Sequence, residues 1–324
     1  MGTREFNPFL FYSKQFQELL SEATKQQNPA LWLFKHDART CLFMLEALTR
    51  LHKQAYDKKI FVKWNNRFKK LEDLLGEIDK YAALEKELKG NKRISPEVLK
   101  YFSVHTNRYV TRFNQRLREK KWLEDKLQKF DKGIKKFDIT YDKDHISLLK
   151  LAIKNEVNEI LDFARKYEYT FTRLEEQVHE LRRKIRWLSI YASCLKGLIQ
   201  LKASSKKHTY HVHYFTKQVL SSPFNRLEPK PKNVTVAQFN KDSFFALSWL
   251  INELGILKDK IITLHELKDA IYVAEDVSEE KALAKAISIL GLKKSAEKDV
   301  LKEASEKIRT VFEKDKILDH LLIA

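Results

Sequence analysis

Four basic side chains recur at helical spacing in the middle of the chain: His179, Arg182, Arg183 and Arg186. At about 100° per residue they fall within a sector of about 100° on a helix. The opposite side carries apolar residues that predict a buried stripe, namely Leu174, Val178, Leu181, Ile185, Leu188 and Leu195. No carboxylate stands among the four basic residues on their own stripe. Such a face repels itself unless an anion neutralises it, and the planar guanidinium group of Arg can donate two hydrogen bonds to one phosphate.

A second stripe has the same character. His105, Arg108, Arg112 and Arg116 fall within a sector of about 80°, while Val110, Phe113 and Leu117 face the other way. This helix either faces the same groove as the first stripe or forms a solvated surface, and the sequence leaves both interpretations open.

The whole chain is basic. Its 324 residues include 62 Lys and Arg against 44 Asp and Glu, a formal net charge of +18. This balance favours a polyanionic partner, which could be nucleic acid, polyphosphate or an anionic membrane surface. No window holds about 18 consecutive apolar residues, so we expect no membrane span. Only two cysteines occur, both within apolar helical patterns, which predicts a reducing compartment and a cytoplasmic location.

Helical periodicity dominates the chain, and Gly and Pro are scarce, with 7 and 6 residues. We expect helices over about 8–26, 29–56, 60–88, 95–130, 145–168, 171–202, 206–221, 236–254, 263–274, 278–290 and 295–322. Ser95 should be an N-cap, with Pro96 in the first turn. Residues 137–141 and 209–214 alternate with period two and could form short strands, but the predicted fold class is all-α.

One motif occurs twice. His36 and Arg39 have the spacing HxxR, and His179 and Arg182 repeat it 143 residues later. Each is followed by a long helical segment and then by Leu-Gly with a downstream aspartate: Leu75-Gly76 with Asp79, and Leu254-Gly255 with Asp259. The same order in both copies predicts two halves built alike.

These motifs resemble those of the CHAD family, the conserved-histidine α-helical domain, over residues 10–275. The resemblance implies two similar helical bundles related by pseudo-twofold symmetry, and a basic groove between them that binds inorganic polyphosphate. It divides the chain into a first half at 1–140, a second half at 141–275 and a C-terminal helical extension at 276–324. The ligand would also imply an association with polyphosphate granules.

The resemblance places the two HxxR motifs and further basic residues in the polyphosphate groove. The expected binding residues are His36, Arg39, His179, Arg182, Arg183, Arg186, Arg108, Arg112 and Arg116. The chain departs from the family pattern at Phe43, Met44, Trp187 and Ser189, where basic residues are common. These departures leave two alternatives open: a helical nucleic-acid-binding module, and a protein-interaction scaffold whose groove is degenerate.

The sequence contains no catalytic signature. It has no glycine-rich phosphate loop, no GxSxG and no HExxH, so we expect a protein that is not an enzyme and needs no cofactor. His208, His211 and His213 lie close together in sequence, but their spacing does not place all three on one helical face. We therefore predict no metal site.

Overall fold

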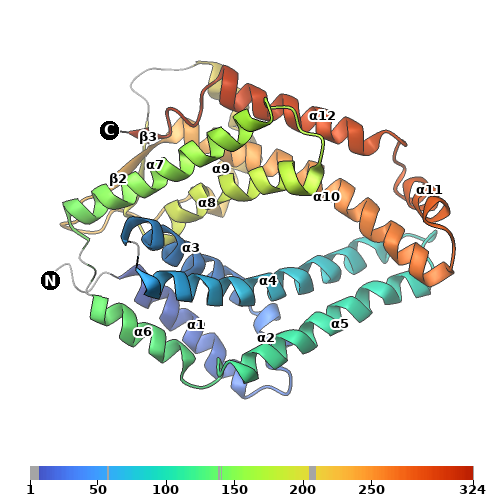
Figure 1. Cartoon of the computed structure of the whole chain (residues 1–324), viewed down its shortest axis with the longest axis horizontal. Helices are drawn as coiled ribbons and strands as arrows, with labels where there is room; N and C mark the ends of the chain where they lie inside the picture. The colour runs from blue at the N-terminus through green and yellow to red at the C-terminus, as the bar shows by residue number, and fades with distance from the viewer. Residues whose placement is uncertain (1–6, 57, 138, 140, 204–208, 324) are drawn as a thin grey trace.

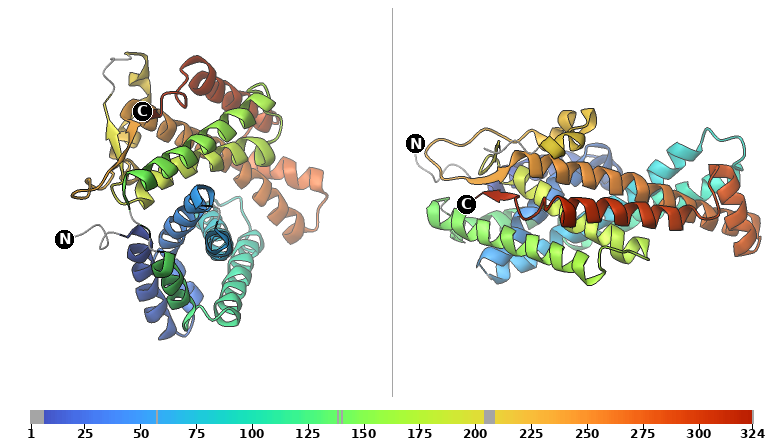
Figure 2. Two further views of the ribbon diagram at one scale, coloured as in Figure 1. Left: turned by 60° about the vertical axis from the view of Figure 1, so that its left-hand side comes forward. Right: turned by 90° about the horizontal axis from the view of Figure 1, so that it is seen from above.

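The computed structural model describes residues 7–56, 58–137, 139, 141–203 and 209–323. The fold is all-α, as predicted (Figure 1). The helices before residue 138 gather on one side of the molecule and those after residue 141 on the other, as the turned view shows (Figure 2). The first group comprises α1 (Pro8–Thr24), α2 (Pro29–Lys35), α3 (Ala38–Tyr56), α4 (Lys59–Leu88), α5 (Pro96–Glu119) and α6 (Lys126–Phe137).

The second group is built around one very long helix, α10 (Lys241–Glu275). Around it lie α7 (Lys143–Lys166), the π-helix η1 (Leu174–His179), α8 (Glu180–Cys194), α9 (Lys217–Ser221), α11 (Glu279–Leu290), α12 (Ala296–Arg309) and the π-helix η4 (Thr310–Lys314). Two short 3₁₀ turns, η2 (Thr209–Tyr214) and η3 (Pro223–Asn225), flank α9. In the described part of the chain, no helix is both long and apolar enough to cross a membrane.

A small sheet closes one end of the second group. Strand β1 (Ile199–Lys202) pairs in parallel with β2 (Ala237–Asn240), and β2 pairs antiparallel with β3 (Leu322–Ile323). The expected helix over 171–202 is therefore wrong in its last residues, because Ile199 pairs with Ala237 in the sheet. Residues 209–214 form a 3₁₀ helix instead of a strand. The suggested strand at 137–141 lies partly outside the described residues.

Helix caps account for several boundaries. The side chain of Ser95 accepts a hydrogen bond from the Val98 amide, with proline in the first turn of α5, which confirms that prediction. The expected helix over 29–56 is interrupted, because Asp37 adopts a φ of 52°, a left-handed conformation that ends α2 just before α3 begins.

One large core joins the two groups of helices. Phe9, Phe61 and Phe68 from the first group share it with Leu181 and Leu250 from the second. The C-terminal residues belong to this core too, since α12 packs against α10. A smaller core lies at the far end of the molecule, where the ends of α4 and α5 meet α10 and α11.

Candidate anion-binding groove

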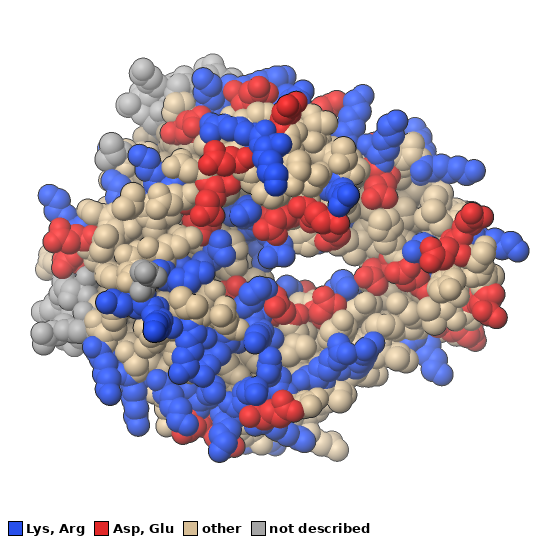
Figure 3. Space-filling model, in the orientation of Figure 1, with Lys and Arg blue, Asp and Glu red and all other residues tan. Residues whose placement is uncertain are grey.

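A groove of about 660 Å³ runs between the α3–α4 pair and the α8–α10 pair. Lysine, arginine and carboxylate side chains all gather around the hollow between α4 and α10 (Figure 3). The basic residues that line it are Arg39, Arg50, Lys69, Lys80, His179, Arg182, Arg183, Arg186 and Lys258. The acidic residues that line it are Glu46, Glu72, Asp73, Glu77, Asp79, Glu87 and Asp259. The groove is thus of mixed charge: most of its acids lie on α4, and α8 contributes only basic ionisable groups.

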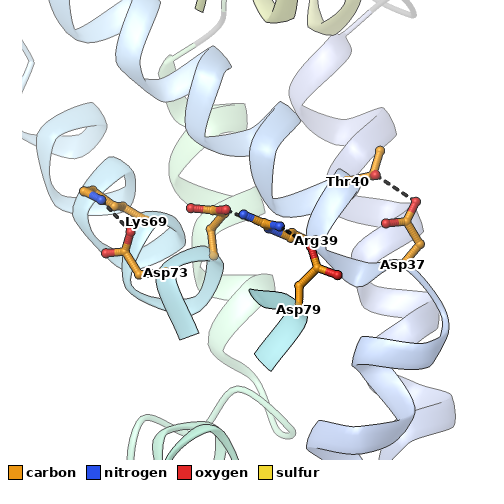
Figure 4. A network of polar contacts seen from close by, with 7 residues as sticks. Asp37, Arg39, Thr40, Lys69, Asp73 and Asp79 are labelled. Carbon is orange, nitrogen blue, oxygen red and sulfur yellow. Dashed lines mark hydrogen bonds and ion pairs between the residues drawn. The ribbon is translucent and has the colours of Figure 1, made fainter. Parts of the chain in front are cut away.

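The first HxxR arginine is already neutralised by α4. Arg39 donates from Nε to Glu72 Oε1 at 2.8 Å and from Nη1 to Asp79 Oδ2 at 2.8 Å (Figure 4). On the same helix, Lys69 pairs with Asp73 at 2.6 Å (Figure 4). Arg39 and Lys69 are therefore paired with carboxylates of α4 before any ligand binds.

The second HxxR arginine is placed like the first, but its partner differs. Arg182 donates from Nε to the backbone oxygen of Ile251 at 2.8 Å, four residues before Gly255. Arg39 likewise donates to Glu72, four residues before Gly76. In both copies the guanidinium group lies against the glycine.

A methyl group added at either glycine would come close to the arginine. An added Cβ would stand 2.9 Å from Nη2 of Arg39 at Gly76, and 2.8 Å from Nη2 of Arg182 at Gly255. In each copy of the motif, the missing side chain of the glycine thus leaves space for the arginine guanidinium group. This local likeness agrees with the predicted internal repeat, while a pseudo-twofold relation between whole bundles stays a prediction.

Arg186 differs from the paired cations of the groove in its neighbours and in its pKa. Its guanidinium group lies over the ring of Phe43 at 4.6 Å. Among the described residues, no carboxylate comes within ion-pair distance of it. Burial, followed by repulsion from Arg182, lowers its pKa to about 10, although Glu72 acts in the opposite sense. A half-buried cation of this kind is stabilised by an anion that enters the groove.

The two motif histidines differ in placement. The ring of His179 lines the groove, and Nδ1 lies 3.0 Å from Glu175 Oε2. His36 is exposed, stacks on Trp32 with ring centres 3.8 Å apart, and lies with Nδ1 2.8 Å from the Trp32 oxygen. His36 does not line this groove, and it does not line the second cavity described below. The assignment of His36 to the groove is therefore wrong.

The second predicted stripe does not face the groove either. His105, Arg108, Arg112 and Arg116 lie on α5, and none of them lines the groove. The α5 residues Phe113 and Leu117 are buried, which leaves Arg108 and Arg112 exposed on the outside of the molecule. Their assignment to the groove is corrected accordingly.

Sequence reasoning singled out the two aspartates of the repeated motif but assigned neither them nor the other carboxylates to the groove. Glu46 is 4% exposed, its Oε2 has no hydrogen-bond partner within the described structure, and burial together with repulsion from Glu72 raises its pKa to about 7. Arg50 also lines the groove, but it is held by Glu156 at 2.9 Å and by the Tyr191 hydroxyl at 2.9 Å. The signal available in the sequence was the run of acids over residues 72–87, which reads equally well as a solvated helix face.

A second cavity of about 610 Å³ adjoins the groove, and its lining combines polar residues with apolar side chains, among them Phe34, Phe43, Met44 and Ile190. Arg182 and Arg186 border both spaces. Within the described ranges, no group of three or more His, Cys, Asp or Glu residues is arranged to hold a metal ion. His208 lies outside those ranges.

Comparison of the chain with protein families, with curated proteins and with solved structures finds no match to any of them.

Proposed function

We propose that the groove binds inorganic polyphosphate along its α8 wall. The observation that carries the proposal is Arg186, a half-buried cation beside Arg182 with no carboxylate at ion-pair distance in the described part of the chain. A phosphate oxygen placed between these two guanidinium groups would relieve their mutual repulsion. It would also form charge-assisted hydrogen bonds of the strong class.

The dimensions suit an extended anion. His179 and Arg186 are seven residues apart, which corresponds to about 10 Å along the helix axis. Lys258 of α10 and Lys80 of α4 line the same groove. A chain of phosphates, with about one negative charge per unit, could contact several of these cations in turn, whereas a single phosphate could contact only one end of the array.

The acids on α4 restrict where the ligand can lie. Glu72 and Asp79 hold Arg39, and a ligand anion would have to compete with both of them. We therefore expect the polyphosphate chain to follow α8 and the facing part of α10, and to contact the first HxxR motif weakly or not at all. Binding then depends on one half of the repeat.

The test compares ligand lengths and two double variants by titration calorimetry. Arg182→Gln with Arg186→Gln removes the two central cations, and we expect affinity for long-chain polyphosphate to fall by about a hundredfold or more, since each charge-assisted contact contributes about 1.5–3 kcal/mol. Lys298→Gln with Lys302→Gln is the matched control, because both lysines are exposed on α12.

Two results would refute the proposal. One is a control that loses as much affinity as the groove variant, because net charge alone would then govern binding. The other is orthophosphate that binds as tightly as the long chain, since that would indicate a discrete phosphate site.

A further inference from the structure

The α5 stripe belongs to a continuous basic surface on the outside of the first group of helices. We call it the outer basic surface and define it by seven residues: Lys63, Arg67, Arg108, Arg112, Arg116, Lys120 and Lys126. They come from the N-terminal half of α4, the C-terminal half of α5, the turn after it and the start of α6. Figure 3 shows lysine and arginine side chains crowded over this part of the molecule, below the groove.

The surface is basic because acids are missing from the segments of α4 and α5 that supply most of its residues. Residues 58–70 contain six Lys or Arg and no Asp or Glu, and residues 98–118 contain five and again none. Because α4 and α5 pack antiparallel, the start of α4 lies near the end of α5 and the start of α6, where Lys63 and Arg67 come close to Lys120 and Lys126. Within the described chain, none of the seven residues has a carboxylate at ion-pair distance, whereas Arg39, Lys80 and Lys258 of the groove each have one.

Lys126 shows how closely the cations approach. Its pKa is lowered by partial burial and then by repulsion from Arg67, Lys129, Lys63 and Lys120. Among these neighbours Lys129 has an acid of its own, Asp125 at 2.8 Å. The remaining charges are held together only by the fold, and their repulsion falls when an anion binds.

We propose that the outer basic surface binds the phosphate backbone of double-stranded nucleic acid, without regard to base sequence. The exposed large apolar side chains on these helices are Val62 and Val104, neither of which is aromatic. Base stacking, which would favour a single strand, therefore has no fully exposed aromatic platform on the described parts of these helices. A duplex offers the higher charge density, with one charge per about 1.7 Å of axis.

The same residues argue against a lipid surface. A helix that lies in a membrane interface buries its apolar face among the acyl chains. Of the apolar residues of α6, Leu127, Phe130 and Ile134 are buried in the protein core, and Phe137 packs against it partly buried. Apart from the two exposed valines of α4 and α5, the described part of the surface offers cations and no exposed large apolar group to insert.

The length of the α5 stripe sets the expected footprint. Arg108 and Lys120 are twelve residues apart, or about 18 Å along the helix. This length corresponds to roughly five phosphates of one strand at 3.4 Å each. About five contacts predict that the logarithm of the binding constant falls with the logarithm of salt concentration with a slope of roughly −4 to −5.

The experiment measures fluorescence anisotropy of a labelled 20-base-pair DNA duplex with the full chain, over a range of salt concentrations. We expect Arg112→Glu with Arg116→Glu, and separately Lys63→Glu with Lys126→Glu, to weaken binding at least tenfold and to make the salt slope shallower. Circular dichroism confirms that each variant is folded.

Two controls separate this surface from net charge and from the groove. Lys298→Glu with Lys302→Glu makes the same charge change on α12, which lies at the opposite edge of the molecule (Figure 1), and should weaken binding less than threefold. Arg182→Gln with Arg186→Gln should leave duplex binding unchanged.

Four results would overturn the proposal. In the first two, the α12 control or the groove variant loses as much duplex binding as the surface variants. In the third, the corresponding single strand binds more tightly than the duplex. In the fourth, vesicles containing phosphatidylserine retain the protein through these residues while the duplex does not bind.

Discussion

Replacing Arg186 by Gln should make the protein more stable and, at the same time, a poorer polyphosphate binder. A guanidinium group whose pKa falls from its usual 12.5 to about 10 is charged at pH 7 in both the folded and the unfolded state. Its charged form is therefore less favourable in the folded protein, by about 3.4 kcal/mol at 1.36 kcal/mol for each power of ten. The contact with Phe43 offsets about 0.5–2 kcal/mol of this. We expect the Gln variant to gain on the order of 1–3 kcal/mol in the free energy of unfolding.

Urea denaturation at pH 7 measures the gain, and calorimetry with long-chain polyphosphate measures the loss of affinity. The matched control is Arg50→Gln in the same groove. Although burial alone would lower the pKa of Arg50, Tyr191 and Glu156 raise it, so its charge is favourable in the folded protein. This control should lose stability, by about 3–5 kcal/mol, because Glu156 is left buried without its cation. If Arg186→Gln is destabilised as much as Arg50→Gln, then Arg186 is satisfied within the protein and the reasoning for an anion site is refuted.

Three further predictions concern the groove and the core. In Gly255→Ala the new methyl group should displace the Arg182 guanidinium group and lower polyphosphate affinity about tenfold. The better helix propensity of Ala limits any loss of stability. Unchanged affinity in calorimetry would show that the position of Arg182 against Gly255 does not matter for binding. Glu46→Gln should raise stability by no more than about 0.4 kcal/mol at pH 4.5, where the folded carboxyl is protonated and the unfolded one is half ionised. Above pH 7 the gain should reach about 3.4 kcal/mol, because the folded pKa of about 7 exceeds the unfolded value of 4.5; urea titrations at pH 4.5 and 8 measure this. Burial lowers the pKa of His52 to about 3 and that of His145 to about 4, so their contribution to stability is fully present above pH 6.5 and is lost as the pH falls toward those values. In the Glu46→Gln background, the free energy of unfolding measured at pH 6, 5 and 4.5 should fall by about 2.7 kcal/mol per pH unit. A flat profile would exclude neutral buried imidazoles.

The sequence was sufficient for the fold class because the helical periodicity is long and breakers are few. The sequence did not predict helix breaks that no residue type marks. Asp37 takes a left-handed conformation between α2 and α3 without a neighbouring Gly or Pro. Conversely, Gly255 looked like a place where a helix ends, yet α10 continues through it from Lys241 to Glu275. Its glycine is required by the approach of Arg182, a contact across 73 positions of sequence that local patterns cannot reveal.

The site was predicted in part. The α8 stripe does line a groove, because the apolar stripe opposite it is buried as expected. The charge of the groove was not predictable from that helix, since the acids come from α3, α4 and α10, which face it only after folding. The α5 stripe follows the same periodicity but points outward. The periodicity shows only that its basic side lies opposite its buried apolar side, and it does not show whether that basic side faces the groove or the outside of the molecule.

Helix α4 has a further consequence for how the protein meets its ligands in solution. Its 30 residues span about 45 Å. Residues 58–70 carry six basic side chains and no acids, whereas residues 71–88 carry six acidic and two basic ones. The side-chain charges add to the backbone dipole of the helix, whose amino end is positive, so α4 carries a permanent electric dipole along its axis. In the field of a polyanion such a dipole experiences a torque that turns the basic end forward. At 0.1 M salt this torque acts only within about 10 Å, so the orienting step in association is fast at low ionic strength and disappears as salt is added, whichever site finally holds the ligand.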